Sequence, residues 1–106
     1  MVLMELSVVP LSTAESISPW VARCVDIIDR SGLDYELHAA GTIVEGPLDR
    51  LTNLLRECIE AVASDCHRVT CLAKFDYKQG ESGRLQSNVD RVAAALGRNV
   101  RTAAGS

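Results

Sequence analysis

Residues 35–45 read YELHAAGTIVE, and this stretch decides the fold. Along residues 35–40 the side chains alternate between two faces, which is typical of a β-strand. Gly41 permits a sharp reversal of the chain, and residues 42–45 follow as a second short strand. The stretch therefore predicts a hairpin of two strands in the middle of the chain.

A strand and a helix are predicted on the amino-terminal side of this hairpin. Residues 2–9 alternate with period two, with one fully apolar face, and Pro10 ends the strand. Ser18 before Pro19 favours a helix start, because Ser caps free N–H groups and Pro suits the first helical position. Apolar residues then recur at helical spacing until Ser31-Gly32, where glycine permits the left-handed end of a helix.

The carboxyl-terminal side repeats this order and adds one helix. Apolar residues at helical spacing predict a helix from Leu48 to about Ser64. Residues 68–76 alternate as a fourth strand, and residues 89–96 have the spacing of a third helix.

The complete order, βαββαβ and then a helix, is that of the ferredoxin-like or split-βαβ fold, an α+β sandwich. We expect a four-stranded antiparallel sheet with helices on one face, formed by a single domain over residues 1–96. Residues 97–106 lack an apolar pattern and are predicted to form a flexible tail.

Composition excludes several classes of protein. The chain has 106 residues, of which 47% are hydrophobic and 24% charged, as in an ordinary globular domain. Its net charge of -3 argues against nucleic acid as a partner, because nucleic-acid binders contact phosphates with clustered Lys and Arg. No apolar run approaches the ~20 residues that cross a bilayer, and residues 1–5 lack the basic start of a signal peptide. The sequence predicts a cytoplasmic protein without a membrane partner.

The cysteines are predicted to be reduced. Cys24, Cys58 and Cys71 lie in apolar patterns, where free cysteine packs as a small hydrophobic residue. Cys66 and His67 lack the C-x-x-C spacing of a zinc site, and no second pair follows them. We therefore expect neither a metal site nor a resident cofactor.

One face of the predicted sheet is left without helices. The more apolar side of each strand should meet the helices, so the opposite sides line this uncovered face. Its expected members are Leu3, Glu5, Ser7, Val9, Glu36, His38, Ala40, Thr42, Val44, Thr70, Leu72 and Lys74. Because exposed apolar patches usually mark an interface, we expect self-association through this face. Assembly would bury the polar members, which then need partners, and a small molecule bound there would supply them.

Four short segments carry a resemblance to a known family. They are residues 5–11 (ELSVVPL), 31–38 (SGLDYELH), 41–46 (GTIVEG) and 74–76 (KFD). In this order they resemble the small thiamine-binding proteins of the MTH1187/YkoF-like family, over roughly residues 1–96. The resemblance implies a ferredoxin-like fold, assembly through sheets into homodimers or homotetramers, and binding of thiamine or hydroxymethylpyrimidine without established catalysis. This chain carries one such domain, unlike members with two in tandem, so a second half would come from another subunit.

The resemblance also implies ligand contacts. Carried onto this sequence, they are Ser7, Thr42 and Glu45, with His38 next. An aminopyrimidine has a ring-nitrogen acceptor beside an amine donor, so Glu45 would accept from the amine while a Ser7 or Thr42 hydroxyl bonds the ring edge. The plainer interpretation of Glu45 is a favourable negative charge near the start of the second predicted helix. The plainer interpretation of His38 is an ordinary strand histidine.

Two other functions compete with a non-catalytic binding protein. One is a regulatory or scaffold oligomer without any small-molecule ligand, whose uncovered face serves only for assembly. The other is an enzyme, which we do not expect, because no Cys–His or Ser–His–Asp arrangement is evident and Cys71 should point into the core. The sequence leaves the physiological ligand open, as well as the choice between dimer and tetramer.

Overall fold

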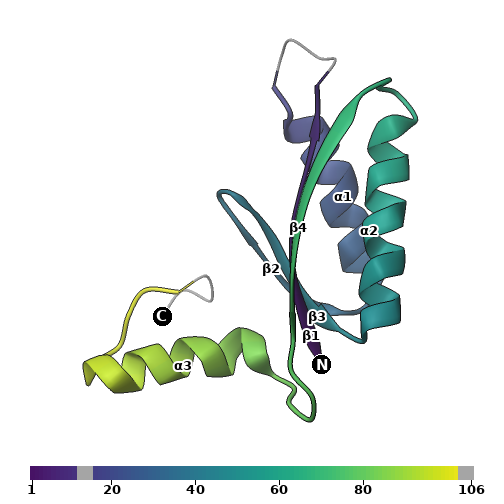
Figure 1. Cartoon of the computed structure of the whole chain (residues 1–106). Coiled ribbons are helices and arrows are strands. Elements are labelled where there is room, and N and C mark those ends of the chain that lie inside the picture. The colour runs from purple at the N-terminus through teal and green to yellow at the C-terminus, as the bar shows by residue number, and fades with distance from the viewer. Residues whose placement is uncertain (12–15, 103–106) are drawn as a thin grey trace.

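The computed structural model describes residues 1–11 and 16–102 and has the predicted order of elements (Figure 1). Within these residues the elements are β1 (Val2–Pro10), α1 (Ser18–Arg30), β2 (Asp34–His38), β3 (Gly41–Gly46), α2 (Leu48–Ala63), β4 (Val69–Tyr77) and α3 (Arg84–Leu96). The predicted ferredoxin-like α+β class is therefore confirmed. None of the described helices is long and apolar enough to span a membrane.

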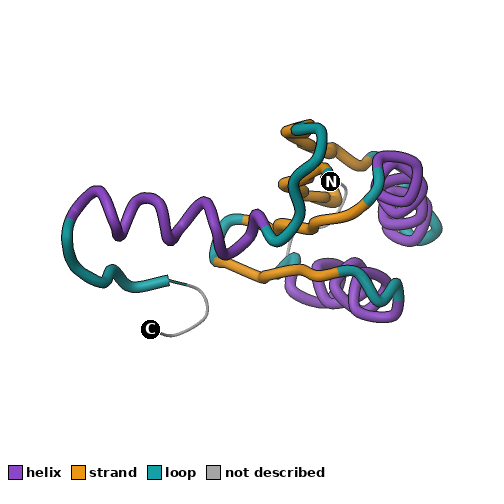
Figure 2. Tube along the Cα trace, turned by 90° about the horizontal axis from the view of Figure 1, so that it is seen from below, coloured by secondary structure: helices purple, strands orange, loops and turns teal. Residues whose placement is uncertain are grey.

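The four strands form one sheet in the order β2-β3-β1-β4, and all neighbouring strands are antiparallel. α1 and α2 lie side by side on one face of this sheet, whereas α3 projects from the other side (Figure 2). β1 is central, so its two faces meet very different surroundings. This arrangement is the two-layer sandwich that the strand and helix order predicts.

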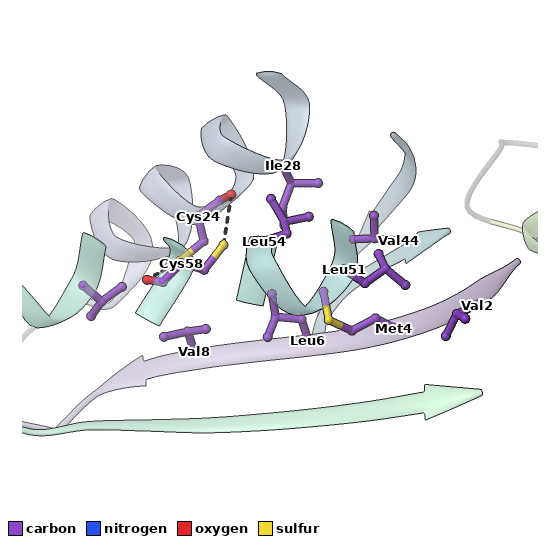
Figure 3. Close-up of a cluster of buried hydrophobic side chains, with 11 residues drawn as sticks. Val2, Met4, Leu6, Val8, Cys24, Ile28, Val44, Leu51, Leu54 and Cys58 are labelled. Atoms are coloured by element: carbon purple, nitrogen blue, oxygen red, sulfur yellow. Dashed lines mark hydrogen bonds between the residues drawn. The ribbon is translucent and has the colours of Figure 1, made fainter. Parts of the chain in front are cut away.

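The core lies between β1 and the two helices (Figure 3). Every second side chain of β1 points into it, which is the period-two face seen in the sequence. Cys24 and Cys58 lie opposite each other on α1 and α2, where each thiol donates to the other residue's carbonyl oxygen over 3.8 Å. The buried cluster consists of Val2, Met4, Leu6, Val8, Cys24, Ile28, Val44, Leu51, Leu54, Cys58 and Val62.

Trp20 packs against the edge of this core from the first turn of α1. The guanidinium of Arg23, one turn further along, lies over its ring at 4.4 Å from the ring centre, a cation–π contact. Arg23 also pairs with Asp65, just beyond the end of α2, at 2.5 Å. The ring is thus held between the core and a cation that ties α1 to α2.

The predicted positions of Thr42 and Val44 on the uncovered face are wrong. In the β1–β3 register Met4 is opposite Val44 and Leu6 is opposite Thr42, so both β3 residues share the helix-covered face. Residues directly opposite in an antiparallel pair point to the same side of the sheet. Leu37 of β2 also pairs with Thr42, and the two-residue turn between His38 and Gly41 forces this phase. Pairing, rather than the pattern within one strand, fixes the side.

The uncovered face, called the open face below, therefore has a different β3 contribution. By register it carries Leu3, Glu5, Ser7, Val9, Asp34, Glu36, His38, Ile43, Glu45, Thr70, Leu72, Lys74 and Asp76. The predicted β1, β2 and β4 members lie on this face, except that Ala40 lies in the turn beyond β2, and Asp34 and Asp76 are added to them. Leu72 is 77% exposed on this face.

Two helix starts differ from the prediction. Ile17 is the cap residue of α1 and makes no side-chain cap bond, and Ser18 is already helical. The Ser18 N–H instead donates to Oγ of Ser16 at 3.2 Å. α3 begins at Arg84 rather than near residue 89, after Gly83 in the left-handed conformation. The helix ends at Leu96, as predicted, and residues 103–106 of the predicted tail lie outside the described part of the chain.

Candidate functional site

The pairing of β1 with β3 stops before β1 ends. The last pair is Leu6 with Thr42, whereas the pairing of β1 with β4 continues to Pro10. A Cβ added at Gly41 would lie 2.8 Å from the Leu6 carbonyl oxygen, so that carbonyl points toward the hairpin. Since strand residues alternate in direction, the N–H and C=O of Val8 point the same way. No described strand pairs with Val8 on that side.

The unpaired side of Val8 borders a cavity of about 270 Å³, which is called the hairpin cavity below. α1 covers it, and the turn between β2 and β3 closes its far side. Its lining is Leu6, Ser7, Val8, Val9, Ile17, Val21, Cys24, Val25, Ile28, Leu37, His38, Ala39, Ala40, Gly41 and Thr42. Most of these side chains are apolar, with few polar groups among them, as in a typical small-molecule pocket.

Three of the four predicted ligand contacts, Ser7, His38 and Thr42, border this cavity. By register only Thr42 points its side chain to the helix-covered side, whereas Ser7 and His38 belong to the open face. Thr42 is buried, with 5% of its surface exposed, because β3 turns it toward the helices. No hydrogen bond joins its hydroxyl to another residue of the described chain. The hydroxyl oxygen is not among the buried unpartnered side-chain atoms of the described residues, so it remains accessible from the cavity and free to bond a ligand atom there.

His38 lies at the boundary between the hairpin cavity and the open face. The Ala40 N–H donates to its Nδ1 at 3.3 Å, so in the neutral ring Nε2 carries the proton. Nε2 lies 3.6 Å from Oε2 of Glu5 on the open face. A hollow of about 460 Å³ on that face is lined by Glu5, Leu6, Ser7, His38, Ala40, Leu72, Ala73 and Lys74. Ser7 and His38 thus border hollows on both sides of the sheet.

An outer cleft of about 830 Å³ continues from the hairpin cavity between α1 and β2. The two hollows share Ile17, Val21, Val25, Leu37, His38 and Ala39. Asp26 and Asp29 form an acidic rim, where Tyr35 donates to Asp29 at 2.9 Å and Arg30 pairs with Asp26 at 3.2 Å. The bond to Asp29 raises the pKa of Tyr35 above its ordinary value, so this phenol stays a neutral donor.

Glu45 lies away from these hollows. It is on the open face at the other end of the sheet, 5% exposed, and its two carboxylate oxygens accept from the Arg84 backbone N–H at 3.2 and 3.0 Å. It therefore stands at the start of α3, a favourable position for a negative charge. From the sequence, Glu45 was interpreted as a negative charge near the start of the second helix, α2. The observed contact is instead with the start of α3.

The cavity wall also contains residues that sequence reasoning did not assign to a site. Val21 and Val25 belong to the apolar stripe of α1, but they are only partly buried because β3 begins only at Gly41 and leaves space beneath them. The Val8 main chain has no side-chain signature at all. Only the strand register, which joins distant segments, could have indicated either feature.

The thiols of the described residues differ in their pKa values. Hydrogen bonding with Cys58 lowers the pKa of Cys24, which lines the hairpin cavity. No three His, Cys, Asp or Glu side chains within the described part of the chain are grouped as metal ligands. The hydrogen bond with Cys24, together with burial, holds the pKa of Cys58 far above its ordinary value, and burial raises the pKa of Cys71. Thiols with raised pKa values stay protonated at neutral pH and are poor nucleophiles.

A four-stranded antiparallel sheet, two helices on one face and an apolar cavity at a hairpin turn define a ferredoxin-like domain with room for a small ligand. The sequence profile of the family described as "Thiamine-binding protein" matches residues 4–93, so the chain belongs to this family. The predicted family is confirmed.

Curated relatives cover most of the chain. A UPF0045 protein of Methanothermobacter thermautotrophicus is 32% identical over 95 residues, which is 87% of this chain and 96% of the relative. The UPF0045 protein MJ1052 of Methanocaldococcus jannaschii is 28% identical over 91 residues, which is 86% of this chain and 91% of the relative.

Solved structures share the fold. The crystal structure of MJ1052 has a TM-score of 0.75 at 28% identity, covering 92% of this chain and 97% of that one. A Thermotoga maritima protein, named for a proposed role in thiamine biosynthesis or salvage, has a TM-score of 0.72 at 22% identity. The aligned part covers 82% of this chain and 95% of the Thermotoga maritima protein. At this identity the similarity supports the fold alone.

Proposed function

We propose that this chain is a non-catalytic binding protein for thiamine or its hydroxymethylpyrimidine part, with the pyrimidine held in the hairpin cavity. One observation carries the proposal. In a member of the thiamine-binding family, Ser7, His38 and Thr42 line one cavity, and the Thr42 hydroxyl in it lacks a partner among the described residues. The location differs from our expectation of a pocket on the open face, because Thr42 faces the helices.

The cavity suits an aminopyrimidine ring. The ring presents an acceptor nitrogen next to an amine donor, and the Val8 main chain presents a donor N–H and an acceptor C=O toward the same space. A flat ring between Val8 and the hairpin would therefore pair with β1 much as a neighbouring strand does. The Thr42 hydroxyl is left to bond a second ring atom or the substituent. A volume of about 270 Å³ is near the small end for ligand pockets, which fits one ring.

The outer cleft suits the second ring of thiamine. The thiazolium ring is a cation, and the carboxylates of Asp26 and Asp29 border the cleft that continues from the cavity. Both carboxylates are exposed, so their attraction for the cation is about 1 kcal/mol or less. We therefore expect thiamine to bind more tightly than hydroxymethylpyrimidine, and the difference to shrink as salt is added.

Ser7 and His38 also border the open face, where the family resemblance implies contact between subunits. A second copy over this face would cover the open-face side of the Ser7–His38 boundary and keep water from the ligand. Homo-oligomerisation is thus part of the proposal. Glu45 is not, because its carboxylate is already engaged by the Arg84 N–H.

The test is calorimetric titration of the whole chain with thiamine and with hydroxymethylpyrimidine. Thr42→Val keeps the side-chain shape and removes the hydroxyl, so we expect about tenfold weaker binding, from the loss of one hydrogen bond. Thr52→Val is the matched control, since Thr52 is exposed on α2 and bonds only its own helix at Leu48 and Asp49. Equal affinity of Thr42→Val and the parent chain would contradict the assigned contact.

Absence of binding by either compound at millimolar concentration would overturn the proposal and favour a scaffold oligomer without ligand. Catalysis is tested separately, by recovering thiamine after long incubation with the pure protein. Unchanged thiamine is the expected result for a binding protein, and the test is a real one because Cys24 lines the cavity and hydrogen bonding with Cys58 lowers its pKa. A converted product would replace the binding function with an enzymatic one.

A further inference from the structure

Two cysteines face each other where α1 packs against α2 (Figure 3). Cys24 and Cys58 are 34 positions apart in the chain, and each Sγ lies 3.8 Å from the carbonyl oxygen of the other residue. The two thiols also hydrogen-bond to each other. Core packing accounts for a small apolar side chain at each position, but it does not require the two sulfur atoms to meet.

The two thiols differ in their access to small molecules. Cys24 lines the hairpin cavity, and 6% of its surface is exposed. Cys58 does not line this cavity, and none of its surface is exposed. A small uncharged reagent that enters the cavity therefore reaches Cys24 before it reaches Cys58.

The two thiols also differ in acidity. The hydrogen bond with Cys58 lowers the pKa of Cys24 against the opposing effect of burial, and the guanidinium of Arg23 lowers it further. Because the thiolate is the reactive form of cysteine, Cys24 is the better nucleophile of the two. The hydrogen bond with Cys24, and then burial, hold the pKa of Cys58 above its ordinary value. Oxidation of Cys24 removes the negative charge on that sulfur, and with it the main cause of the raised pKa of Cys58.

We propose that Cys24 and Cys58 are a site of reversible oxidation, at which a small peroxide enters the hairpin cavity, oxidises Cys24, and leaves a disulfide between α1 and α2. A cavity of about 270 Å³ admits a peroxide, whereas a bulky disulfide reagent is kept from the buried sulfur. The sulfur atoms of a disulfide are about 2 Å apart, so the two thiols must approach further, which rotation of the side chains about their Cα–Cβ bonds provides.

The reaction balances with hydrogen peroxide as the oxidant. The Cys24 thiolate attacks one peroxide oxygen, the O–O bond breaks, and the departing hydroxide takes up a proton and leaves as water. Cys24 is then a sulfenic acid, which condenses with a neighbouring thiol. The Cys58 sulfur attacks the Cys24 sulfur, and its proton leaves with the displaced hydroxide as a second water. Two thiols have lost two electrons, and a dithiol reductant returns them by thiol–disulfide exchange.

The first experiment treats the reduced whole chain with equimolar hydrogen peroxide, without thiamine. The intact mass is expected to fall by two hydrogen atoms, and tryptic peptides 24–30 and 57–68 are expected to be joined until dithiothreitol is added. Peptide 57–68 also contains Cys66, so the digest is repeated on Cys66→Ala, where the same join is expected. Free Cys24 and Cys58 after treatment, or a join of either to Cys71 in place of the other, would overturn the proposal.

The second experiment identifies the thiol that reacts first. In Cys58→Ala the sulfenic acid at Cys24 has lost its partner, so dimedone is expected to label Cys24. Cys24→Ala leaves only the less accessible thiol, and oxidation of Cys58 is expected to be roughly tenfold slower or more. The parent chain, given a short peroxide pulse with dimedone present, should carry the label on Cys24, which checks the order without any substitution. A label on Cys58 in the parent chain would contradict entry through the cavity.

The third experiment asks whether an occupied cavity protects Cys24, and this arm alone rests on the proposed function. Thiamine at a saturating concentration is expected to slow disulfide formation. Thiamine that binds by calorimetry and leaves the rate unchanged would show that peroxide reaches the pair by another route, against the proposal. Thiamine that does not bind contradicts the proposed function only, because the disulfide itself is measured in the first experiment without it.

Discussion

The two halves of β1 have the same alternating sequence and opposite roles. Residues 2–6 are paired on both sides, by β3 and β4, and their inward side chains form the centre of the core. Residues 7–10 are paired only by β4, and beside them lies the hairpin cavity. The difference teaches that one strand supplies both a rigid support and a binding wall. What separates the two is where the neighbouring strand begins, at Gly41.

The largest effect is expected in the doubly paired half. Met4 is fully buried beneath the helices, so Met4→Ala should lower the free energy of unfolding by about 3 kcal/mol, through lost burial and a cavity. Leu48→Ala, at an exposed position on α2, should cost less than about 0.5 kcal/mol and serves as the control. Urea titration measures both. Similar losses of unfolding free energy in the two variants would show that the doubly paired half of β1 is not the well-packed part of the core.

The boundary between the halves should be nearly as sensitive. Gly41→Ala would bring a Cβ to 2.8 Å from the Leu6 carbonyl, a backbone atom that cannot rotate away. We expect a loss of about 2 kcal/mol as the hairpin is pushed off β1, and weaker thiamine binding as well. At Gly46, in the doubly paired half, a Cβ meets only the Leu33 side chain at 3.1 Å. Gly46→Ala should therefore cost less, and the reverse order would contradict the boundary.

Glu45 separates stability from binding. Glu45→Gln keeps the shape but removes the charge that accepts from the α3 start, so a loss of about 1 kcal/mol is expected. Thiamine affinity should not change, because Glu45 lies at the doubly paired end of the sheet, away from the cavity. Denaturant titration and calorimetry on the same sample test both parts. If Glu45→Gln weakened thiamine binding as much as Thr42→Val does, Glu45 would have to be counted among the ligand contacts.

The smallest effect is a pH dependence at the base of α3. Lys78, with Arg91, lowers the pKa of Glu81 below its ordinary value of 4.5. A carboxylate with a lowered pKa stabilises the fold above pH 4.5 and loses that contribution as the pH falls through the lowered value. Melting temperature should fall slightly more steeply below pH 4.5 in the parent than in Glu81→Gln. Because Glu81 is partly exposed, added salt should reduce the difference.

The local sequence pattern was sufficient to predict the helices and strands and, for most of them, the side that faces the core. Period two identified β1 and β4 and the side of each that meets the helices, because both strands are long and regular. Spacing of apolar residues identified α1 and α2, and each buries residues of its apolar stripe, Cys24 and Ile28 in α1 and Leu51, Cys58 and Val62 in α2. The family followed from short segments in a fixed order.

Features that depend on distant pairing were not visible in the sequence. Thr42 and Val44 were placed on the wrong side because the phase of β3 is set by a two-residue turn and by β1. The partner of Glu45 is 39 positions away at Arg84, and that contact also explains why α3 starts earlier than its apolar pattern. Ser7, His38 and Thr42 were chosen separately by resemblance, and only the fold brings them to one cavity.

Trp20, the single tryptophan of the chain, gives the protein an internal optical probe. Its indole sits on the turn of α1 that supplies Ile17 and Val21 to the hairpin cavity, stacked under Arg23. The ring does not line that cavity, but the turn that carries it does, so a guest that shifts this turn is expected to change the emission intensity and wavelength. Titrations can thus be followed at micromolar protein, on the unmodified chain, by the light that one side chain emits.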